Sequence, residues 1–418
     1  MTIQITTLAN GLRVATDAMR EAESAVIGAW VGVGTRHEPW NANGVAHLVE
    51  HMMFKGTRER SAYALSAEIE KNGGAMNAHT TREETAYYAR VLPEDAELAC
   101  DIVADMLQHS VFDARELDRE RQVIIQEIAS DNDTPEEHVF DRLHTLAFPL
   151  QRLGRPILGS PEVIAKLPRR AVKNYVQQHY HAGNIVMVGA GRVVHKNFVE
   201  MVERRFSRLP RGRPTAITRA QVKSGDSRKA DDIEQLHLIL AFPAPGFRRE
   251  AVYPTQLLSI LLGGTSSSRL FQKVREKRGL VYTVQTSHLA FEDVGLFEIY
   301  AGTDPARVKE LVPVICNELV DVRRRVTPAE LRLAKAQARA DILMGQENVM
   351  RRAVVLGHQI LAFNRAIPIE RILQKLMTVT KTDVQETART LFTRRPLVTA
   401  LGPLEGLESY ARIRGRLG

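Results

Sequence analysis

The feature that most constrains the fold is an internal repeat, because the same order of predicted elements occurs twice in the 418 residues. In each half, the spacing of apolar residues predicts a strand, two helices, two strands and a helix. The first series covers residues 24–108 and the second covers residues 235–320. The segments GGAMNAHT and RGLVYTVQT fall at the same place in the two series, which sets Asn77 against Tyr282. We therefore predict two tandem homologous domains.

A segment without sustained periodicity separates the two halves. Residues 209–234 are rich in proline, glycine and charged side chains, which is typical of a domain boundary. We predict an N-terminal domain over residues 1–212, a linker over 213–232 and a C-terminal domain of the same fold over 233–418. Successive strands set between helices favour the α+β class, in which each domain is a largely antiparallel sheet covered by helices on one face.

The composition is ordinary for a globular protein, with 44% hydrophobic and 25% charged residues. No apolar run reaches the roughly 18 residues that a membrane span needs, so we expect none. The start, MTIQITTLANGLRVATD, lacks the pattern of a secretory signal or a mitochondrial transit peptide. Cys100 and Cys316 lie in apolar helical contexts and are expected to be buried thiols. We expect a bacterial cytoplasmic protein, or a mitochondrial matrix protein if the chain is a processed form.

The net charge of +8 raises the question of nucleic-acid binding. The basic residues gather in RRFSRLPRGRPTAITR, in DVRRRV and in the C-terminal RIRGRLG. These segments have no interleaved aromatic residues, and aromatic residues make up only 6% of the chain. We interpret them as solvated faces and linker, and expect no nucleic-acid partner.

One short stretch, GVAHLVEHMMFKGT at residues 44–57, carries candidate chemistry. If it is helical, His47 and His51 are four residues apart and project from one face, which suits two imidazoles on one zinc ion. Glu50 lies beside them, where a carboxylate could take a proton from water and return it to a leaving amine. His-x-x-Glu-His is the inverted form of a zinc-protease motif. The alternative is a pair of ordinary helix residues, so a third ligand is needed.

A third ligand could come from ELDRERQVIIQEIASDND, residues 116–133. Glu127 falls within the apolar stripe of this predicted helix, and Glu120 lies two turns earlier on a similar face. A carboxylate on an apolar face is costly unless positive charge meets it. Zinc would supply that charge, but so would Arg119 or Arg121. The residues alone therefore choose neither between a metal ligand and a buried ion pair nor between the two glutamates.

With Glu127 placed 76 residues after His51, the HLVEH motif resembles the pitrilysin/insulinase family of zinc peptidases. The resemblance extends along the chain through GGAMNAHTTREETAYYARVL and LLGGTSSSRLFQKVREKRGLVYTV. Within the family, the length and the phrase HMMFKGT are most similar to the mitochondrial processing peptidase β subunit and its bacterial homologues. The resemblance implies a zinc metalloendopeptidase with a catalytic, zinc-binding N-terminal domain. The C-terminal domain would bind substrate and form part of a chamber.

The resemblance assigns catalytic roles to five residues of the N-terminal half. His47, His51 and Glu127 would bind one Zn²⁺ per chain. Glu50 would be the general base and then the general acid. Glu120 would orient one of the ligands through a hydrogen bond.

It also assigns residues that would contact the substrate. Asn77 and Ala78 would lie on an edge strand to which the substrate adds as an extended strand. Arg275 and Tyr282 match a family Arg/Tyr pair that helps to hold the oxyanion of the tetrahedral intermediate. Their spacing alone would not have indicated this, because RLFQKVREKRG reads as a plain amphipathic helix.

Three further residues concern specificity. Glu137 and Asp141 fall where the processing peptidase binds an arginine two positions before the cleaved bond. They are four residues apart on a predicted helix, and two carboxylates suit a guanidinium. Phe54 falls where the family lines an apolar pocket just after the bond. The alternatives are a solvated acidic helix face for the first two and a core position for Phe54.

The resemblance finally implies partners. A chain of this length has two of the four halves of the long single-chain relatives, so enclosing a basic, unfolded peptide would require a homodimer or a heterodimer with a paralogous subunit. One alternative function is a non-catalytic structural subunit, like the core proteins of the respiratory bc1 complex, which share the fold. Another is a general oligopeptide-degrading peptidase without arginine preference. The presence of both histidines and both glutamates of the motif favours an enzyme.

Overall fold

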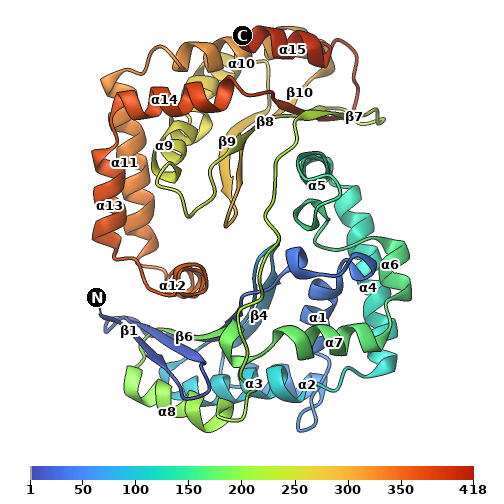
Figure 1. The fold of residues 1–418 in the computed structure, drawn as a ribbon, viewed down its shortest axis with the longest axis vertical. Helices are drawn as coiled ribbons and strands as arrows, with labels where there is room; N and C mark the ends of the chain where they lie inside the picture. The colour runs from blue at the N-terminus through green and yellow to red at the C-terminus, as the bar shows by residue number, and fades with distance from the viewer. Residues whose placement is uncertain (1) are drawn as a thin grey trace. The chain divides into compact units, whose positions relative to one another are not determined.

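The computed structural model describes residues 2–418, which form two compact units (Figure 1). The first unit comprises the chain up to Ala129 together with residues 155–218 and 343–367. The second comprises residues 130–154, 219–342 and 368–418. Each unit therefore contains one short segment from the opposite half of the sequence, an exchange that the repeat did not predict.

The sheet of the first unit has the strand order β1-β2-β6-β3-β5-β4. Its strands are β1 (Thr2–Thr7), β2 (Arg13–Ala18), β3 (Ala25–Val31), β4 (Ala75–Thr80), β5 (Thr85–Val91) and β6 (Ile185–Gly191). All neighbours pair antiparallel except β2 and β6, which are parallel. The central strand β3 is buried along its whole length, whereas β4 lies at a free edge.

Helices of the N-terminal half cover one face of this sheet. They are α1 (Val45–Met53), α2 (Ala62–Glu70), α3 (Ala96–His109), α4 (Ala114–Asn132), α6 (Pro161–Lys166), α7 (Arg169–His179) and α8 (His195–Phe206). Successive residues of a strand point to opposite faces, so Ile27 and Ala29 of β3 pack with Leu48 and Met52 of α1 in one core. The metal-motif helix thus shares a core with the central strand, and it packs against β4 and α7.

The opposite face of the sheet is covered as well, by α12 (Val349–Phe363). Val26 and Trp30 of β3 point to this side and pack with Leu356 and Ile360. At Gly357 an added Cβ would lie 2.5 Å from Trp30 Cγ, so only glycine permits this close approach. This corrects the expectation of helices on one face only. It escaped prediction because α12 comes from the distant C-terminal half.

The sheet of the second unit has the order β7-β11-β8-β10-β9. Its strands are β7 (Gly225–Lys229), β8 (Leu236–Ala244), β9 (Thr283–Ala290), β10 (Gly295–Thr303) and β11 (Leu397–Leu401), antiparallel except for β7 and β11. Strand β7 lies inside the segment predicted as a linker. Its sequence GDSRK has no strand-like alternation of its own, and its pairing partner lies far along the chain.

The helices of the second unit also cover both faces of their sheet. One face packs against α9 (Val252–Gly263) and α14 (Lys381–Phe392), with α10 (Val308–Val322), α11 (Pro328–Gly345), α13 (Ile369–Thr378) and α15 (Tyr410–Leu417) in the same core. On the other face, Val139 and Leu143 of α5 (Pro135–Ala147) pack with Ile239 and Tyr300. The α+β class and the two largely antiparallel sheets are confirmed. Over residues 2–418, no helix is both long enough and apolar enough to cross a membrane.

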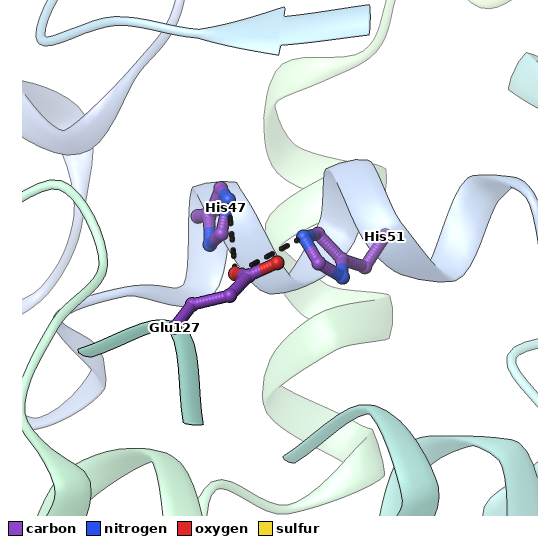
Figure 2. Close-up of side chains that lie close together, drawn as sticks. All are labelled: His47, His51 and Glu127. Carbon is purple, nitrogen blue, oxygen red and sulfur yellow. Dashed lines mark ion pairs between the residues drawn. The ribbon is translucent and has the colours of Figure 1, made fainter. Parts of the chain in front are cut away.

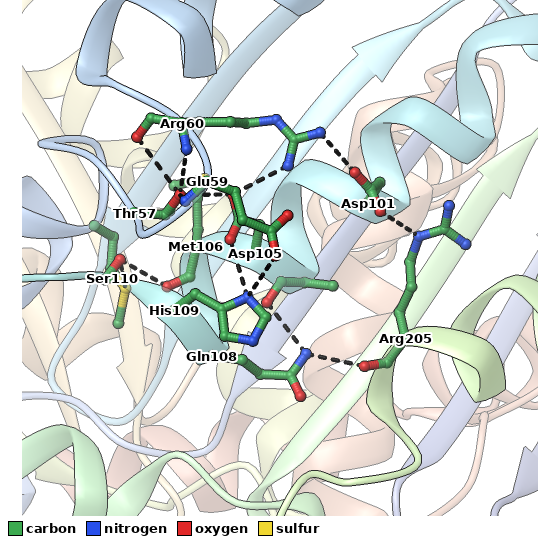
Figure 3. A network of polar contacts seen from close by, with 12 residues as sticks. Thr57, Glu59, Arg60, Asp101, Asp105, Met106, Gln108, His109, Ser110 and Arg205 are labelled. Atoms are coloured by element: carbon green, nitrogen blue, oxygen red, sulfur yellow. Dashed lines mark hydrogen bonds and ion pairs between the residues drawn. The ribbon is translucent and has the colours of Figure 1, made fainter.

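A polar network ties the loop after α1 to α3 (Figure 3). Thr57 Oγ1 donates to Asp105 Oδ2 at 2.7 Å, and Arg60 Nη1 donates to the same oxygen at 3.0 Å. The Arg60 guanidinium also binds Asp101, which accepts a second bond from Arg205 of α8. The loop that follows the metal-motif helix is therefore held to α3 by charge-assisted bonds, and α3 is bound in turn to α8.

Candidate metal centre

Helix α1 presents its polar residues on one face. Leu48 and Met52 are fully buried in the core, whereas His47, Glu50 and His51 are half-buried on the opposite side. This separation follows from the helical period, because residues three and four apart share a face. The predicted helix and its grouping of the motif residues therefore agree with the structure.

His47, His51 and Glu127 converge on one point (Figure 2). The Nε2 atoms of His47 and His51 lie 3.9 and 3.6 Å from Glu127 Oε2, and the two rings lie 4.5 Å apart. One ligand atom from each residue lies within 4.8 Å of the others. Donors at these separations can share one ion that lies about 2 Å from each of them.

The chemistry of the three donors fits a zinc ion. Glu127 Oε2 and His47 Nδ1 are buried atoms without a hydrogen-bond partner among residues 2–418. Burial and the nearby His51 lower the pKa of His47 to about 4, so its imidazole is neutral at pH 7 and can donate a lone pair. A set of two imidazole nitrogens and one carboxylate oxygen, with room for a fourth ligand, is typical of catalytic zinc sites.

Glu120 takes a different role from Glu127. Its Oε2 lies 2.9 Å from His51 Nδ1, and its Oε1 lies 2.8 Å from Lys55 Nζ. Burial alone would lower the pKa of His51, but the bond to Glu120 raises it above its usual value. Glu120 thus fixes the ring so that Nε2 faces Glu127.

The arginines that could have paired with these glutamates lie elsewhere. Arg119 binds Glu116 at 2.6 Å, and Arg121 binds Asp118 and the Leu167 carbonyl. The sequence left open whether these glutamates pair with an arginine or bind a metal, and the contacts of Arg119 and Arg121 disfavour the arginine ion pair. No arginine compensates Glu127 within the described chain, and the partners that face it are the two histidines.

Glu50 is placed beside the three donors without being one of them. Burial raises the pKa of its carboxyl above the usual range, which a hydrogen bond from Thr80 partly offsets. Its Oε2 has no hydrogen-bond partner in the described part of the chain. A half-buried carboxylate with one uncommitted oxygen is suited to accept a proton from water.

The predicted substrate residues of the first unit lie on β4 and at the end of α1. Asn77 is exposed and Ala78 is half-buried on β4, whose outer edge pairs with no strand among the described residues. The Asn77 side chain accepts a bond from the Ala78 amide at 2.8 Å. Phe54, the residue directly after α1, is half-buried against the core.

The remaining predicted residues belong to the second unit. Arg275 is exposed on a π-helical segment, Phe271–Glu276, and its guanidinium lies 4.8 Å from the Phe271 ring. Tyr282 is 63% exposed just before β9. The plain amphipathic helix expected here is thus partly a π-helix, a rare form that is frequently found at functional sites.

Glu137 and Asp141 lie on the first turns of α5, also in the second unit. A third carboxyl, Asp131, lies close enough to bond Glu137. Burial, Asp141 and Glu137 together raise the pKa of Asp131 to about 6. Sequence reasoning missed Asp131 because a helix break at Thr134 separates it from the other two, so helical spacing could not relate them.

A second group of possible ligands consists of Glu59, Asp105 and His109 (Figure 3). Its central carboxylate, Asp105, already has hydrogen-bond partners within the protein. Asp105 accepts bonds from Thr57, Arg60 and the His109 Nδ1 at 3.0 Å. Since Arg60 already compensates this carboxylate, the group is a structural network. Within residues 2–418, the donors around Glu127 are therefore the better candidate for a metal.

Comparison with known proteins identifies the family. Residues 13–161 match "Insulinase (Peptidase family M16)", and residues 166–338 match "Peptidase M16 inactive domain". A protein of Rickettsia felis named "uncharacterized zinc protease" is 37% identical over 400 residues, covering 96% of this chain and 97% of the relative. The chain belongs to the insulinase family of peptidases. A Bacillus subtilis protein, also named an uncharacterized zinc protease, is 33% identical over 405 residues and covers 96% of this chain and 99% of its own length.

Solved structures share the fold of this M16 family member. A protease from Helicobacter pylori superposes with a TM-score of 0.89 at 21% identity, covering 96% of this chain and all of its own. A chain in complex III2 from Candida albicans superposes with a TM-score of 0.88 at 20% identity, over the full length of both. The fold alone therefore occurs both in a protease and in a chain of a larger complex.

Proposed function

We propose that this M16 peptidase is a zinc metalloendopeptidase that hydrolyses extended peptides or targeting presequences. The observation that carries the proposal is the convergence of His47, His51 and Glu127 beside Glu50. A zinc ion held by the three donors would supply positive charge that polarises a peptide carbonyl and a water molecule. The full-length relatives named zinc proteases support the same activity.

Residues of the chain itself would then carry out the proton transfers. Glu50 accepts a proton from the attacking water at its uncommitted Oε2, and returns it to the leaving nitrogen. Glu120 holds the His51 ring in one orientation through the 2.9 Å bond, so that ring does not turn away during the reaction. Arg275 and Tyr282 would stabilise the developing oxyanion, a role that rests on the family resemblance.

The free edge of β4 would bind the substrate backbone as an added strand. An edge strand presents unpaired N–H and C=O groups that an extended peptide can satisfy. Glu50 bonds Thr80 at the end of the same strand, so a peptide paired along β4 passes the general base. An extended or unfolded substrate follows, because a folded one could not supply a free strand.

An arginine preference would come from the three carboxyls Asp131, Glu137 and Asp141. Glu137 and Asp141 are one helical turn apart on α5, and Asp131 lies within bonding reach of Glu137. Every charged group that shifts the pKa of Asp131 is acidic, so the cluster repels itself. A guanidinium would relieve this repulsion and can bind carboxylates in bidentate fashion.

The preference predicts a change in specificity. A Glu137→Gln/Asp141→Asn double variant should lower the ratio of kcat/KM for an arginine peptide to that for its norleucine analogue about 10- to 100-fold, from the roughly 1.5–3 kcal/mol of a charged hydrogen bond. Glu136→Gln, an exposed position on the same helix, is the matched control and should leave the ratio unchanged. An unaltered ratio in the double variant would refute the arginine pocket and favour general oligopeptide degradation.

The activity itself is tested by metal analysis and a peptide survey. We expect one zinc per purified chain and cleavage within a library of unstructured peptides, abolished by a chelator and restored by zinc. A metal-free protein that cuts no peptide would instead favour a structural subunit, since the same fold occurs in a complex III2 chain.

We further propose a homodimer or a heterodimer with a paralogous chain, acting in the bacterial cytoplasm.

A further inference from the structure

The first turn of the metal-motif helix does not cap itself. Helix α1 begins at Val45 after Gly44, which has φ of 90° and no side chain to accept a backbone N–H. An added Cβ at Gly44 would lie 2.7 Å from the Leu158 carbonyl oxygen, so no capping residue fits there. The first N–H groups of a helix need an acceptor from elsewhere, especially in a helix of nine residues, which is too short to be stable alone.

The carboxylate of Glu38, six residues before Gly44, supplies that acceptor. Glu38 Oε1 accepts the Ala46 N–H at 2.8 Å, and its Oε2 accepts the Gly44 N–H at 2.9 Å and the Asn43 side-chain amide at 2.8 Å. Both oxygens therefore bind groups at the start of α1. A negative charge at a helix N-terminus also interacts favourably with the helix dipole.

This carboxylate is fully enclosed. Glu38 has no exposed surface, and burial raises its pKa to about 7 against the opposing effect of its hydrogen bonds. Arg155 donates to the Pro39 carbonyl at 3.0 Å and stacks 3.7 Å from the centre of the Trp40 ring. The loop that carries Glu38 is thus clamped, so the carboxylate cannot follow the helix if the first turn moves.

We propose that Glu38 is a positioning residue that holds the first turn of α1, and with it His47, in the geometry needed to bind zinc. His47 directly follows Ala46, whose amide Glu38 binds, whereas His51 lies one turn further on and is held by Glu120. Fraying of the first turn would therefore move one ligand relative to the other. The inference rests on the proposed zinc site.

The test compares zinc affinity in Glu38→Gln, Glu38→Asp and wild-type protein, measured by chelator competition on protein shown to be folded by circular dichroism. Glutamine has a single acceptor oxygen, so one of the two backbone N–H groups loses its partner. We expect zinc affinity to fall about 10- to 100-fold, as for other groups that support metal ligands. At saturating zinc, kcat should recover and KM for peptide should be unchanged.

A matched control is Ser61→Ala, which removes the N-cap of the neighbouring helix α2. This variant also loses a hydrogen bond at a helix N-terminus, but its zinc affinity should equal the wild-type value. Hydrogen exchange of the Ala46 amide in metal-free wild-type protein provides a readout that needs no variant, and we expect protection.

Two results would overturn the inference: wild-type zinc affinity in folded Glu38→Gln, or an unprotected Ala46 amide in wild-type protein. If Glu38→Gln does not fold, the inference is tested by the zinc affinity of Glu38→Asp and by the hydrogen exchange of the Ala46 amide in wild-type protein. Wild-type protein that binds no zinc would instead contradict the proposed function, whatever the exchange of Ala46 shows.

Discussion

Replacing Glu50 with glutamine should lower kcat for peptide cleavage about 100- to 10,000-fold, the usual contribution of a general acid–base group. The amide cannot accept the proton that the attacking water must lose. The side chain keeps its size, so the half-buried environment beside Thr80 should persist. Because Glu50 is not among the three converging donors, zinc content should remain that of the wild-type protein.

Two measurements on one preparation check this result: metal content and single-turnover cleavage of a peptide found in the library survey. Glu70→Gln, an exposed glutamate on α2, controls for the loss of a negative charge in the same unit. Full cleavage activity in Glu50→Gln would show that Glu50 is not the general base. Loss of zinc in the same variant would instead indicate that Glu50 is a zinc ligand.

The sequence predicted the repeat and the metal-motif helix because both depend on local periodicity. Leu48 and Met52 recur at the spacing that buries one helix face, which leaves His47 and His51 together on the other. The same reasoning failed for α12 and β7, whose partners lie in the opposite half or far along the chain. Pattern alone specifies which face of an element is apolar but not which distant segment covers it.

The third ligand shows the same limit at the level of one side chain. Glu120 and Glu127 both fall on the inward side of α4, and helical spacing cannot tell them apart. Only the position of α1 against α4 separates them, since Glu120 reaches His51 Nδ1 and Lys55 whereas Glu127 reaches the Nε2 atoms. Glu38 could not be predicted for a similar reason, because its role depends on a turn that returns it to the start of α1.

Replacing Glu127 with glutamine should abolish both zinc binding and cleavage. The variant keeps the shape of the side chain but loses the negative charge that faces His47 and His51. We expect zinc affinity to fall by more than about 100-fold, because loss of a group that merely supports a ligand already costs about 10- to 100-fold. Glu50→Gln should keep its zinc, whereas Glu127→Gln should not regain a wild-type zinc content even when zinc is added at micromolar concentration.

The matched control is Glu116→Gln on the same helix, where the carboxylate pairs with Arg119 at the surface and contributes little to stability. It should retain zinc and activity. Glutamine keeps a polar end at the same place and the Glu127 side chain is partly exposed, so metal-free Glu127→Gln should have a urea midpoint close to that of the metal-free wild type. A variant that lost zinc through unfolding would be less stable, so the urea midpoint separates loss of a ligand from loss of the fold. Retention of zinc in the folded variant would exclude Glu127 as a ligand.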